Sequence, residues 1–221
     1  MRKVIGGVFQ SLDGVIQAPG GPTEDPTGDF QHGGWLPAFF DDAVGQAMGA
    51  FFGRPYDLLL GRRTYDIFAA YWPYVSGDHA MLGEAFDAAG KYVLTRGDQD
   101  LPWANSHRLA GIDDVAALKR TDGPDLLIQG SSTIYPALLA AGLLDELMLM
   151  TFPVVLGQGK RLFGDGTPAG AFALVDQKLS PSGVVIATYK PSGPVTAGWA
   201  GPPSTSAREQ ARQRAMRDGT W

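Results

Sequence analysis

The chain has 221 residues and no cysteine, and its 44% hydrophobic content is enough for a sizeable core, in one large domain or in one domain with an appendage. The lack of cysteine excludes disulfides, a thiolate nucleophile and cysteine-ligated metal centres, and a net charge of −5 argues against nonspecific nucleic-acid binding. No apolar run reaches the roughly 20 residues that span a bilayer, so we expect a cytoplasmic protein with no membrane partner.

Short β-rich apolar runs alternate with segments of helical periodicity, which is typical of an α/β sheet. In chain order, the predicted strands are 4–9, 57–60, 91–95, 107–109, 125–128, 146–155, 172–179 and 184–189, and the predicted helices are 41–52, 64–71, 79–88, 112–120 and 133–141. The last two strands leave no room for a helix between them. We therefore expect an antiparallel hairpin at one edge of a mixed, mostly parallel sheet.

Two segments differ from this pattern in composition. Residues 18–34, APGGPTEDPTGDFQHGG, form a polar loop too long for an ordinary connection, and we expect either a mobile lid or an unstructured insertion. Residues 191–221 read as a Pro/Gly/Ser-rich linker followed by a short basic helix, AREQARQRAMR, which either docks or frays. The predicted division is a domain at 1–190 and a tail at 191–221.

Asp13 lies in the stretch FQSLDGVI, where the first predicted strand leaves the core. An Asp-Gly pair at a strand end usually forms a turn, because glycine accepts positive φ and aspartate bonds its own backbone. From this stretch alone, a turn residue and a pocket acid both remain open.

Three polar turns follow predicted strands, at the edge where open α/β sheets bind ligands. They are Gly61-Arg62-Arg63-Thr64-Tyr65, Thr95-Arg96-Gly97 and Gln129-Gly130-Ser131-Ser132-Thr133-Ile134-Tyr135. Free N–H groups at helix starts and arginine side chains are favourable for a phosphate, although each turn alone could be structural. Together they favour one long polyanionic cofactor, such as a dinucleotide. Because no Gly-x-Gly-x-x-Gly follows the first strand, a fold other than the Rossmann domain is required.

Several stretches together resemble the dihydrofolate reductase-like superfamily, and more closely the family that includes the reductase domain of riboflavin biosynthesis. They are FQSLDGVI, LLLGRRTYDIF, KYVLTR, LLIQGSSTIYPALLAAGLLDELMLMTFPVVLGQGKRLF and the final hairpin. The resemblance covers about residues 2–190, and its most specific part is PVVLGQGKRLF. It implies a three-layer α/β fold with helices on both faces of the sheet, NADPH as cofactor, and a stand-alone homodimeric reductase similar to 5-amino-6-(5-phosphoribosylamino)uracil reductase.

The resemblance also implies roles for individual cofactor-binding residues. Arg62 and Thr64, helped by Arg63 and by the close backbone approach at Gly61, would hold the pyrophosphate and adenosine side, and Thr95 and Arg96 would meet the 2′-phosphate. Gly130, Ser131, Ser132 and Thr133 would cradle the pyrophosphate, with Tyr135 turned towards the nicotinamide. The backbone of Val8 and Phe9 and the side chain of Ile16 would flank the nicotinamide ring.

On the substrate side, the resemblance makes Asp13 the candidate catalytic residue, which would accept hydrogen bonds from an aminopyrimidine or help to deliver a proton. Ser11 is its companion, and Trp35 and Phe40 could line a pocket for a flat ring. Asp41 and Asp42 are either substrate-facing acids or ordinary helix-start residues. A true dihydrofolate reductase carries an acid near the position of Gly45, so folate reduction is doubtful.

The leading hypothesis is an NADPH-dependent reductase of a small planar heterocycle, of the pterin or ribosylaminopyrimidine type. The alternative is a catalytically silent NADP(H)-binding or interaction module of the same fold. A true dihydrofolate reductase is a third possibility.

No metal site is predicted, because the histidines are scattered. The apolar strand at 147–155 belongs either to a homodimer interface, since related domains commonly pair, or to the ordinary core.

Overall fold

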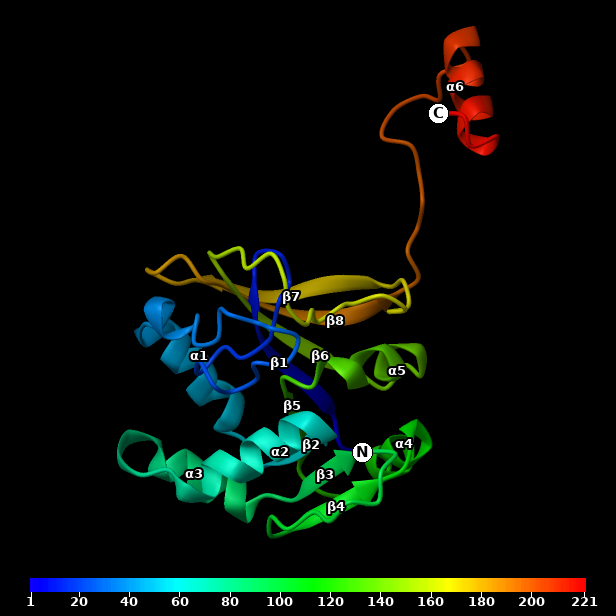
Figure 1. The fold of residues 1–221 in the computed structure, drawn as a ribbon. Helices are drawn as coiled ribbons and strands as arrows, with labels where there is room; N and C mark the ends of the chain where they lie inside the picture. Colours follow the sequence, from blue (N-terminus) through cyan, green and yellow to red (C-terminus); the bar gives the residue numbers. More distant parts are fainter.

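The computed structural model describes residues 1–221 and contains an eight-stranded mixed sheet (Figure 1). The strands are β1 (Val4–Ser11), β2 (Tyr56–Gly61), β3 (Lys91–Leu94), β4 (Ser106–Leu109), β5 (Asp125–Gln129), β6 (Glu146–Phe152), β7 (Ala171–Leu179) and β8 (Val185–Gly193). The helices are α1 (Asp42–Phe52), α2 (Arg62–Tyr71), α3 (Ala80–Ala88), α4 (Ile112–Lys119), α5 (Tyr135–Ala140) and α6 (Ala207–Arg217). Every predicted strand and helix is therefore confirmed.

The strand order is β4-β3-β2-β5-β1-β6-β8-β7, and only β8 runs antiparallel to its neighbours. This confirms the mostly parallel sheet with a C-terminal antiparallel hairpin. β6 ends at Phe152 and not at Val155 as predicted, because Pro153 has no N–H to continue the ladder. The predicted helix at 133–141 begins as a 3-10 turn at Ser132–Ile134 before α5.

Helices cover both faces of the sheet, as expected (Figure 1). Alternate residues of β1 and β5 point to opposite faces. Val4 and Leu126 share a core cluster with α4 and α5, whereas Ile5 and Leu127 pack with Phe51 of α1. Since all four strand residues are almost fully buried, these two strands form the centre of the fold.

Two glycines in β1 allow both helix layers to approach the sheet closely. A Cβ atom at Gly7 would lie 2.6 Å from the ring of Phe51, and one at Gly6 would lie 2.5 Å from the hydroxyl of Tyr135. A side chain at either position would force the packed aromatic ring to move. The glycine pair in the first strand is thus explained by packing.

The loop at 18–34 is neither of the two alternatives that its composition suggested, since it is packed against the domain. Phe30 and Trp35 are buried in the same core cluster as Phe152. The side chain of Gln17 donates to the carbonyl oxygens of Asp25 and Thr27, at 2.9 and 2.8 Å. The loop carries its own apolar anchors and internal hydrogen bonds, which composition alone does not reveal.

The strand predicted for either a dimer interface or the core lies inside the sheet. β6 pairs with β1 on one edge and with β8 on the other, and Leu147, Met150 and Phe152 are buried. Its apolar character therefore reflects the core, and the edge strands of the sheet are β4 and β7.

The tail leaves the sheet where β8 ends, at Gly193, and carries α6 away from the domain on an extended linker (Figure 1). All side-chain hydrogen bonds of residues 204–220 are made within the tail. None of the six helices combines the length and the apolar character that crossing a bilayer requires.

Candidate functional site

The three predicted turns lie side by side at one edge of the sheet. They follow β3, β2 and β5, which are neighbours in the sheet, and the FQSLDGVI stretch follows β1, the next strand in the same row. Because these strands are parallel, their carboxyl ends meet at the same edge. The sheet therefore assembles one continuous row of polar turns from segments far apart in the sequence.

The turns after β2 and β5 are joined by a side chain. The backbone N–H of Gly61 donates to the hydroxyl of Ser131 at 3.0 Å, and Ser131 is buried with a left-handed φ of 56°. A Cβ atom at Gly61 would lie 3.4 Å from the hydroxyl of Thr133, and one at Gly130 would lie 3.8 Å from the hydroxyl of Thr64. Two glycines and two threonine hydroxyls thus border the same small region.

Arginine side chains connect the β2 turn to the β3 turn. The Nε atom of Arg62 donates to both carboxylate oxygens of Asp66, at 2.8 and 2.9 Å, and its Nη1 donates to the carbonyl of Gln99 at 3.2 Å. Asp66 raises the pKa of Arg62. Arg63 and Arg96 are exposed and form no ion pair, so their charges are available to a ligand.

Two residues near these turns were missed by the sequence analysis. Arg108 on β4 donates to the carbonyl oxygens of Gly97 and Gln99 and so holds the β3 turn. Gln129 immediately precedes Gly130, and its buried Oε1 has no hydrogen-bond partner. Arg108 belongs to no motif and lies in the short strand predicted at 107–109, whereas Gln129 lies within the LLIQGSSTIY stretch but was assigned no role.

Asp13 directs its carboxylate at the loop after β6, residues 153–161, which we call the β6 loop. One oxygen accepts from the hydroxyl of Ser11 at 2.7 Å and from the N–H of Leu156 at 3.1 Å, and the other accepts from the N–H of Gly157 at 2.9 Å. The guanidinium of Arg161 lies 3.5 Å away. These hydrogen bonds, that from Ser11 most of all, lower the pKa of Asp13 from 3.8 to about 2.

The β6 loop is also tied to the segment that follows Asp13. The N–H of Leu12 donates to the carbonyl of Val154, and that of Ile16 donates to the carbonyl of Lys160, both at 2.8 Å. The N–H of Lys160 donates to the side-chain oxygen of Gln17 at 3.0 Å, and its ammonium forms an ion pair with the buried Asp25. PVVLGQGKRLF was the most specific stretch in the sequence, and these contacts give it a structural role.

Three predicted site residues are buried in ways that differ from their predicted roles. Ser11 has no exposed surface, and its hydroxyl accepts from Val15 N–H while donating its only proton to Asp13, so it is closed to a substrate. Tyr135 is also fully buried and packs into the core beneath Gly6. Burial raises the pKa of its phenol. Trp35 is 7% exposed and donates to the carbonyl of Gln17, so it is a core residue of the loop and does not line a pocket.

The remaining predicted residues lie at the same edge of the sheet with different exposures. Val8 is buried, so only its backbone could meet a ligand, while Phe9 and Ile16 are half-buried. Ser132 is half-buried, Thr95 is half-buried and Thr133 is exposed. Asp42 is exposed in the first turn of α1, and the side chain of Phe40 is 50% exposed.

Asp41, which precedes Asp42 and was predicted with it, is the N-cap of α1. Its carboxylate accepts from the N–H of Val44 at 3.0 Å and from that of Ser182 at 2.9 Å. These hydrogen bonds lower its pKa to about 2. Asp41 is therefore a helix-start residue that also holds the β7–β8 turn.

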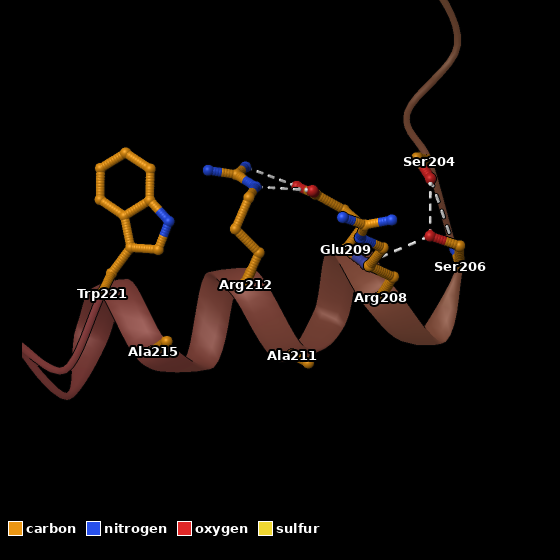
Figure 2. A pocket seen from close by; sticks show the side chains of 8 residues that line it. All are labelled: Ser204, Ser206, Arg208, Glu209, Ala211, Arg212, Ala215 and Trp221. Atoms are coloured by element: carbon orange, nitrogen blue, oxygen red, sulfur yellow. Dashed lines mark hydrogen bonds and ion pairs between the residues drawn. The ribbon is translucent and has the colours of Figure 1, made fainter.

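Two surface hollows lie away from this edge. One of about 590 Å³ runs along α6 and is lined by tail residues, including Arg208, Arg212 and Trp221 (Figure 2). The other, of about 440 Å³, lies between α1 and strands β6 to β8. Neither contains any of the predicted site residues.

Comparison with known proteins agrees with this architecture. The uncharacterized protein YyaP of Bacillus subtilis (strain 168) is 27% identical over 198 residues, which cover 87% of this chain and 96% of YyaP. A Shewanella sp. PV-4 protein, whose assignment to riboflavin biosynthesis is itself provisional, has a TM-score of 0.65 at 21% identity and covers 86% of this chain and 99% of its own.

The fold is also that of dihydrofolate reductase. The enzyme from Enterococcus faecalis, solved with NADP(H), matches with a TM-score of 0.52 at 16% identity over 86% of this chain and 96% of its own. The sequence pattern of the RibD C-terminal domain matches residues 2–186, nearly the whole α/β domain. With its strand order, its row of polar turns and this match together, the chain belongs to the RibD C-terminal domain family.

Proposed function

We propose that the chain is an NADPH-dependent reductase that transfers a hydride to a small planar heterocycle of the pterin or ribosylaminopyrimidine type. The observation that carries the proposal is the continuous row of polar turns after β3, β2 and β5, next to the end of β1. Family membership supports a reductase, and the provisional assignment of the Shewanella protein to riboflavin biosynthesis supports the substrate class. The NADP(H) complex of the Enterococcus enzyme supports the cofactor.

The residues in this row fit a dinucleotide that carries an additional phosphate. Arg63 and Arg96 are exposed cations without carboxylate partners, and a 2′-phosphate requires such a charge. Gly61 and Gly130 have no side chains to obstruct a backbone approach, and the hydroxyls of Thr64 and Thr133 lie beside them. The two threonine hydroxyls can donate hydrogen bonds to phosphate oxygens, which is the chemistry that a pyrophosphate needs.

In this proposal, NADPH supplies the hydride when it is bound. The chain positions the cofactor and the substrate and excludes water from the reacting ring. Arg63, Arg96 and the β5 turn hold the anionic end, and Phe9 and Ile16 orient the reacting ring at the end of β1. The segments after β1 and β6 exclude water from that end. Asp13 stays a predicted site residue, but its carboxylate is ionised at neutral pH. We assign the proton to solvent or to the substrate.

A catalytically silent NADP(H)-binding module is the second candidate. It is favoured by one observation: Ser11 and Asp13, the polar side chains predicted for the substrate side, are both engaged by the protein itself. True folate reduction gains nothing from the structure, because Asp41 caps α1 and no acidic side chain replaces Gly45.

The test is a titration of the protein with NADPH and, separately, NADH, following the fluorescence of its five tryptophans and the melting temperature. We expect saturable binding that prefers NADPH. Since a hydrogen bond to a charged group contributes about 1.5–3 kcal/mol, Arg96→Ala should weaken NADPH roughly 10- to 100-fold and leave NADH almost unchanged.

Arg120→Ala is the matched control, because Arg120 is exposed and lies after α4, on the side where β5 begins, away from the carboxyl ends of the strands. Binding by wild type should then be followed by a screen of pterins and ribosylaminopyrimidines for NADPH oxidation. Turnover would favour the reductase, and cofactor binding without turnover across the screen would favour the silent module. Failure to bind either nucleotide would contradict both.

We also propose that the chain forms a homodimer in the cytoplasm. The free edge strand β7 carries the exposed apolar side chains Leu174, Val175 and Leu179, which supports association. Light scattering on the purified protein would measure its mass against the 23.5 kDa of one chain, and a monomer at all concentrations would contradict the homodimer.

A further inference from the structure

The carboxylate of Asp13 is saturated by contacts from within the protein. Its two oxygens receive the hydroxyl of Ser11 and the N–H groups of Leu156 and Gly157, with the guanidinium of Arg161 beside them. An ionised carboxylate has about four lone-pair positions. A substrate that needed this carboxylate would have to displace one of these donors.

The side chain of Arg161 also links Asp13 to the β6 loop. Its Nε donates to the backbone carbonyl of Asp13 at 2.9 Å, and its Nη2 donates to the carbonyl of Gly157 at 3.1 Å. Arg161 therefore bridges the end of β1 and the β6 loop, and the negative charge of Asp13 balances its positive charge. The carboxylate of Asp13 is 21% exposed and the Arg161 side chain 44% exposed, so the contact lies at the rim of the domain.

The β6 loop contains no helix or strand, so these contacts, together with those to Leu12, Ile16 and Gln17, hold it in place. Gly157 and Gly159 have φ values of 77° and 123°, which only glycine adopts readily. Asp13 is the only partner that the structure gives to the N–H groups of Leu156 and Gly157. These N–H groups are near solvent, so water can replace the carboxylate without unfolding the domain.

We propose that Asp13 is a positioning residue, which fixes the β6 loop against the end of β1 and thereby sets the position of Ile16 at the nicotinamide side of the site. The backbone of Ile16 bonds to Lys160 of the same loop at 2.8 Å, which gives the mechanical connection. The effect of the loop on the bound cofactor rests on the proposed function, whereas the fixing of the loop by Asp13 is independent of it.

A low pKa agrees with this assignment. Since the Asp13 pKa lies near 2, its carboxyl is almost never protonated at neutral pH, whereas an efficient general acid has a pKa near the working pH. The sequence leaves a turn residue and a pocket acid open for Asp13, and the structure points to a third role. The residue forms a long-range contact that holds the β6 loop against the end of β1.

The experiment compares wild type with Asp13→Ala and Asp13→Asn, and uses Asp165→Asn as the control, because Asp165 is exposed and forms no ion pair. Amide hydrogen exchange is measured first. In both Asp13 variants, the amides within residues 154–161 should exchange roughly fivefold faster or more, since each lost hydrogen bond contributes about 1 kcal/mol. The core strands β2 and β5 and the control variant should be unchanged.

Asn is informative because it keeps the shape of aspartate. Its amide would place N–H groups towards Gly157 N–H and Arg161, which are themselves donors, so at least one contact is lost. If exchange in 154–161 is unchanged in both variants, Asp13 does not fix the loop and the proposal is overturned.

Binding measurements then distinguish effects at the nicotinamide end of the cofactor from effects at its adenosine end. The affinities of NADPH and of 2′,5′-ADP, which lacks the nicotinamide, are measured for each variant. A loosened loop should weaken NADPH several-fold and leave 2′,5′-ADP unchanged. Equal affinity for NADPH in all variants, with faster loop exchange, would overturn the connection to Ile16. If wild type binds neither ligand, the proposed function fails, and the exchange data still decide whether Asp13 fixes the loop.

Discussion

At the residue scale, Lys91 shows how a charge is held inside this protein. The side chain has no exposed surface, and its ammonium donates to the carbonyls of Phe86 and Asp87, both at 2.9 Å. It lies 4.5 Å from the ring centroid of Trp103. Carbonyl groups at the end of α3 and an aromatic face replace water around the cation. Burial nevertheless lowers its pKa from 10.5 to about 8.

This shift predicts a particular dependence of stability on pH. Below pH 8, Lys91 is protonated in both the folded and unfolded states, and the cost of its burial is fully present. Between pH 8 and 10.5, the unfolded chain keeps the proton and the folded protein releases it, so the free energy of unfolding gains a positive contribution as pH rises. By this linkage the contribution is on the order of 1–3 kcal/mol.

Urea unfolding at several pH values checks this prediction. The stability difference between wild type and Lys91→Met should shift in favour of wild type between pH 8 and 10.5, because the variant has no proton to release. Lys3→Met, at an exposed lysine, is the control and should show a constant difference. A constant difference for Lys91→Met as well would mean that its pKa is not lowered.

At the element scale, one buried side chain supplies two of the side-chain hydrogen bonds that connect the long loop at 18–34 to its surroundings. Gln17 is 4% exposed and forms three hydrogen bonds, donating to the carbonyls of Asp25 and Thr27 and accepting from Lys160 N–H. It therefore connects the loop both to itself and to the β6 loop. The ion pair between Lys160 and Asp25 connects the same two segments.

Removing this connection should release the loop and leave the sheet intact. Gln17→Ala leaves buried polar groups unpaired, which costs about 1–3 kcal/mol for each group that water does not reach. We expect a lower melting temperature and new proteolytic cleavage within 18–34 under native conditions, measured by mass spectrometry of the fragments. Gln31→Ala, on the exposed part of the same loop, is the control. Cleavage that is equal in both variants would show that Gln17 does not hold the loop.

At the scale of the whole molecule, the tail is separate from the domain. α6 is capped by Ser206, whose hydroxyl accepts from Glu209 N–H at 3.2 Å, and Glu209 pairs with Arg212 (Figure 2). The helix has no buried residue. Its stability therefore comes from local contacts, which are marginal for a helix of this length in water.

A chain truncated after Gly193 should consequently keep the stability and the cofactor affinity of the full chain. We expect melting temperatures that agree within about 1 °C, because no apolar surface of the domain is uncovered. Scanning calorimetry on both forms is the measurement. A decrease of several degrees on truncation would mean that the tail packs on the domain in solution.

The order of the elements could be predicted because the signals are local. Alternation of apolar residues predicts a strand, and helical periodicity predicts a helix. Pro153 is a local signal for the end of β6, although the predicted strand continued past it. The three polar turns could be placed at one edge for the same reason, since each directly follows a strand and parallel strands share an edge. The burial of Ser11, Trp35 and Tyr135 could not be predicted, because it depends on how distant segments pack around each side chain.

By itself, the sequence of this protein determined its strands and helices, the polar turns at their ends and the family resemblance, because all of these depend on neighbours along the chain. Only the tertiary structure decided the role of Asp13, since its partners Leu156 and Gly157 are 143 and 144 residues away. They become its neighbours because β6 pairs with β1, which brings the β6 loop to the end of the first strand. Pairing between strands is a property of the whole sheet, and a short sequence pattern does not contain it.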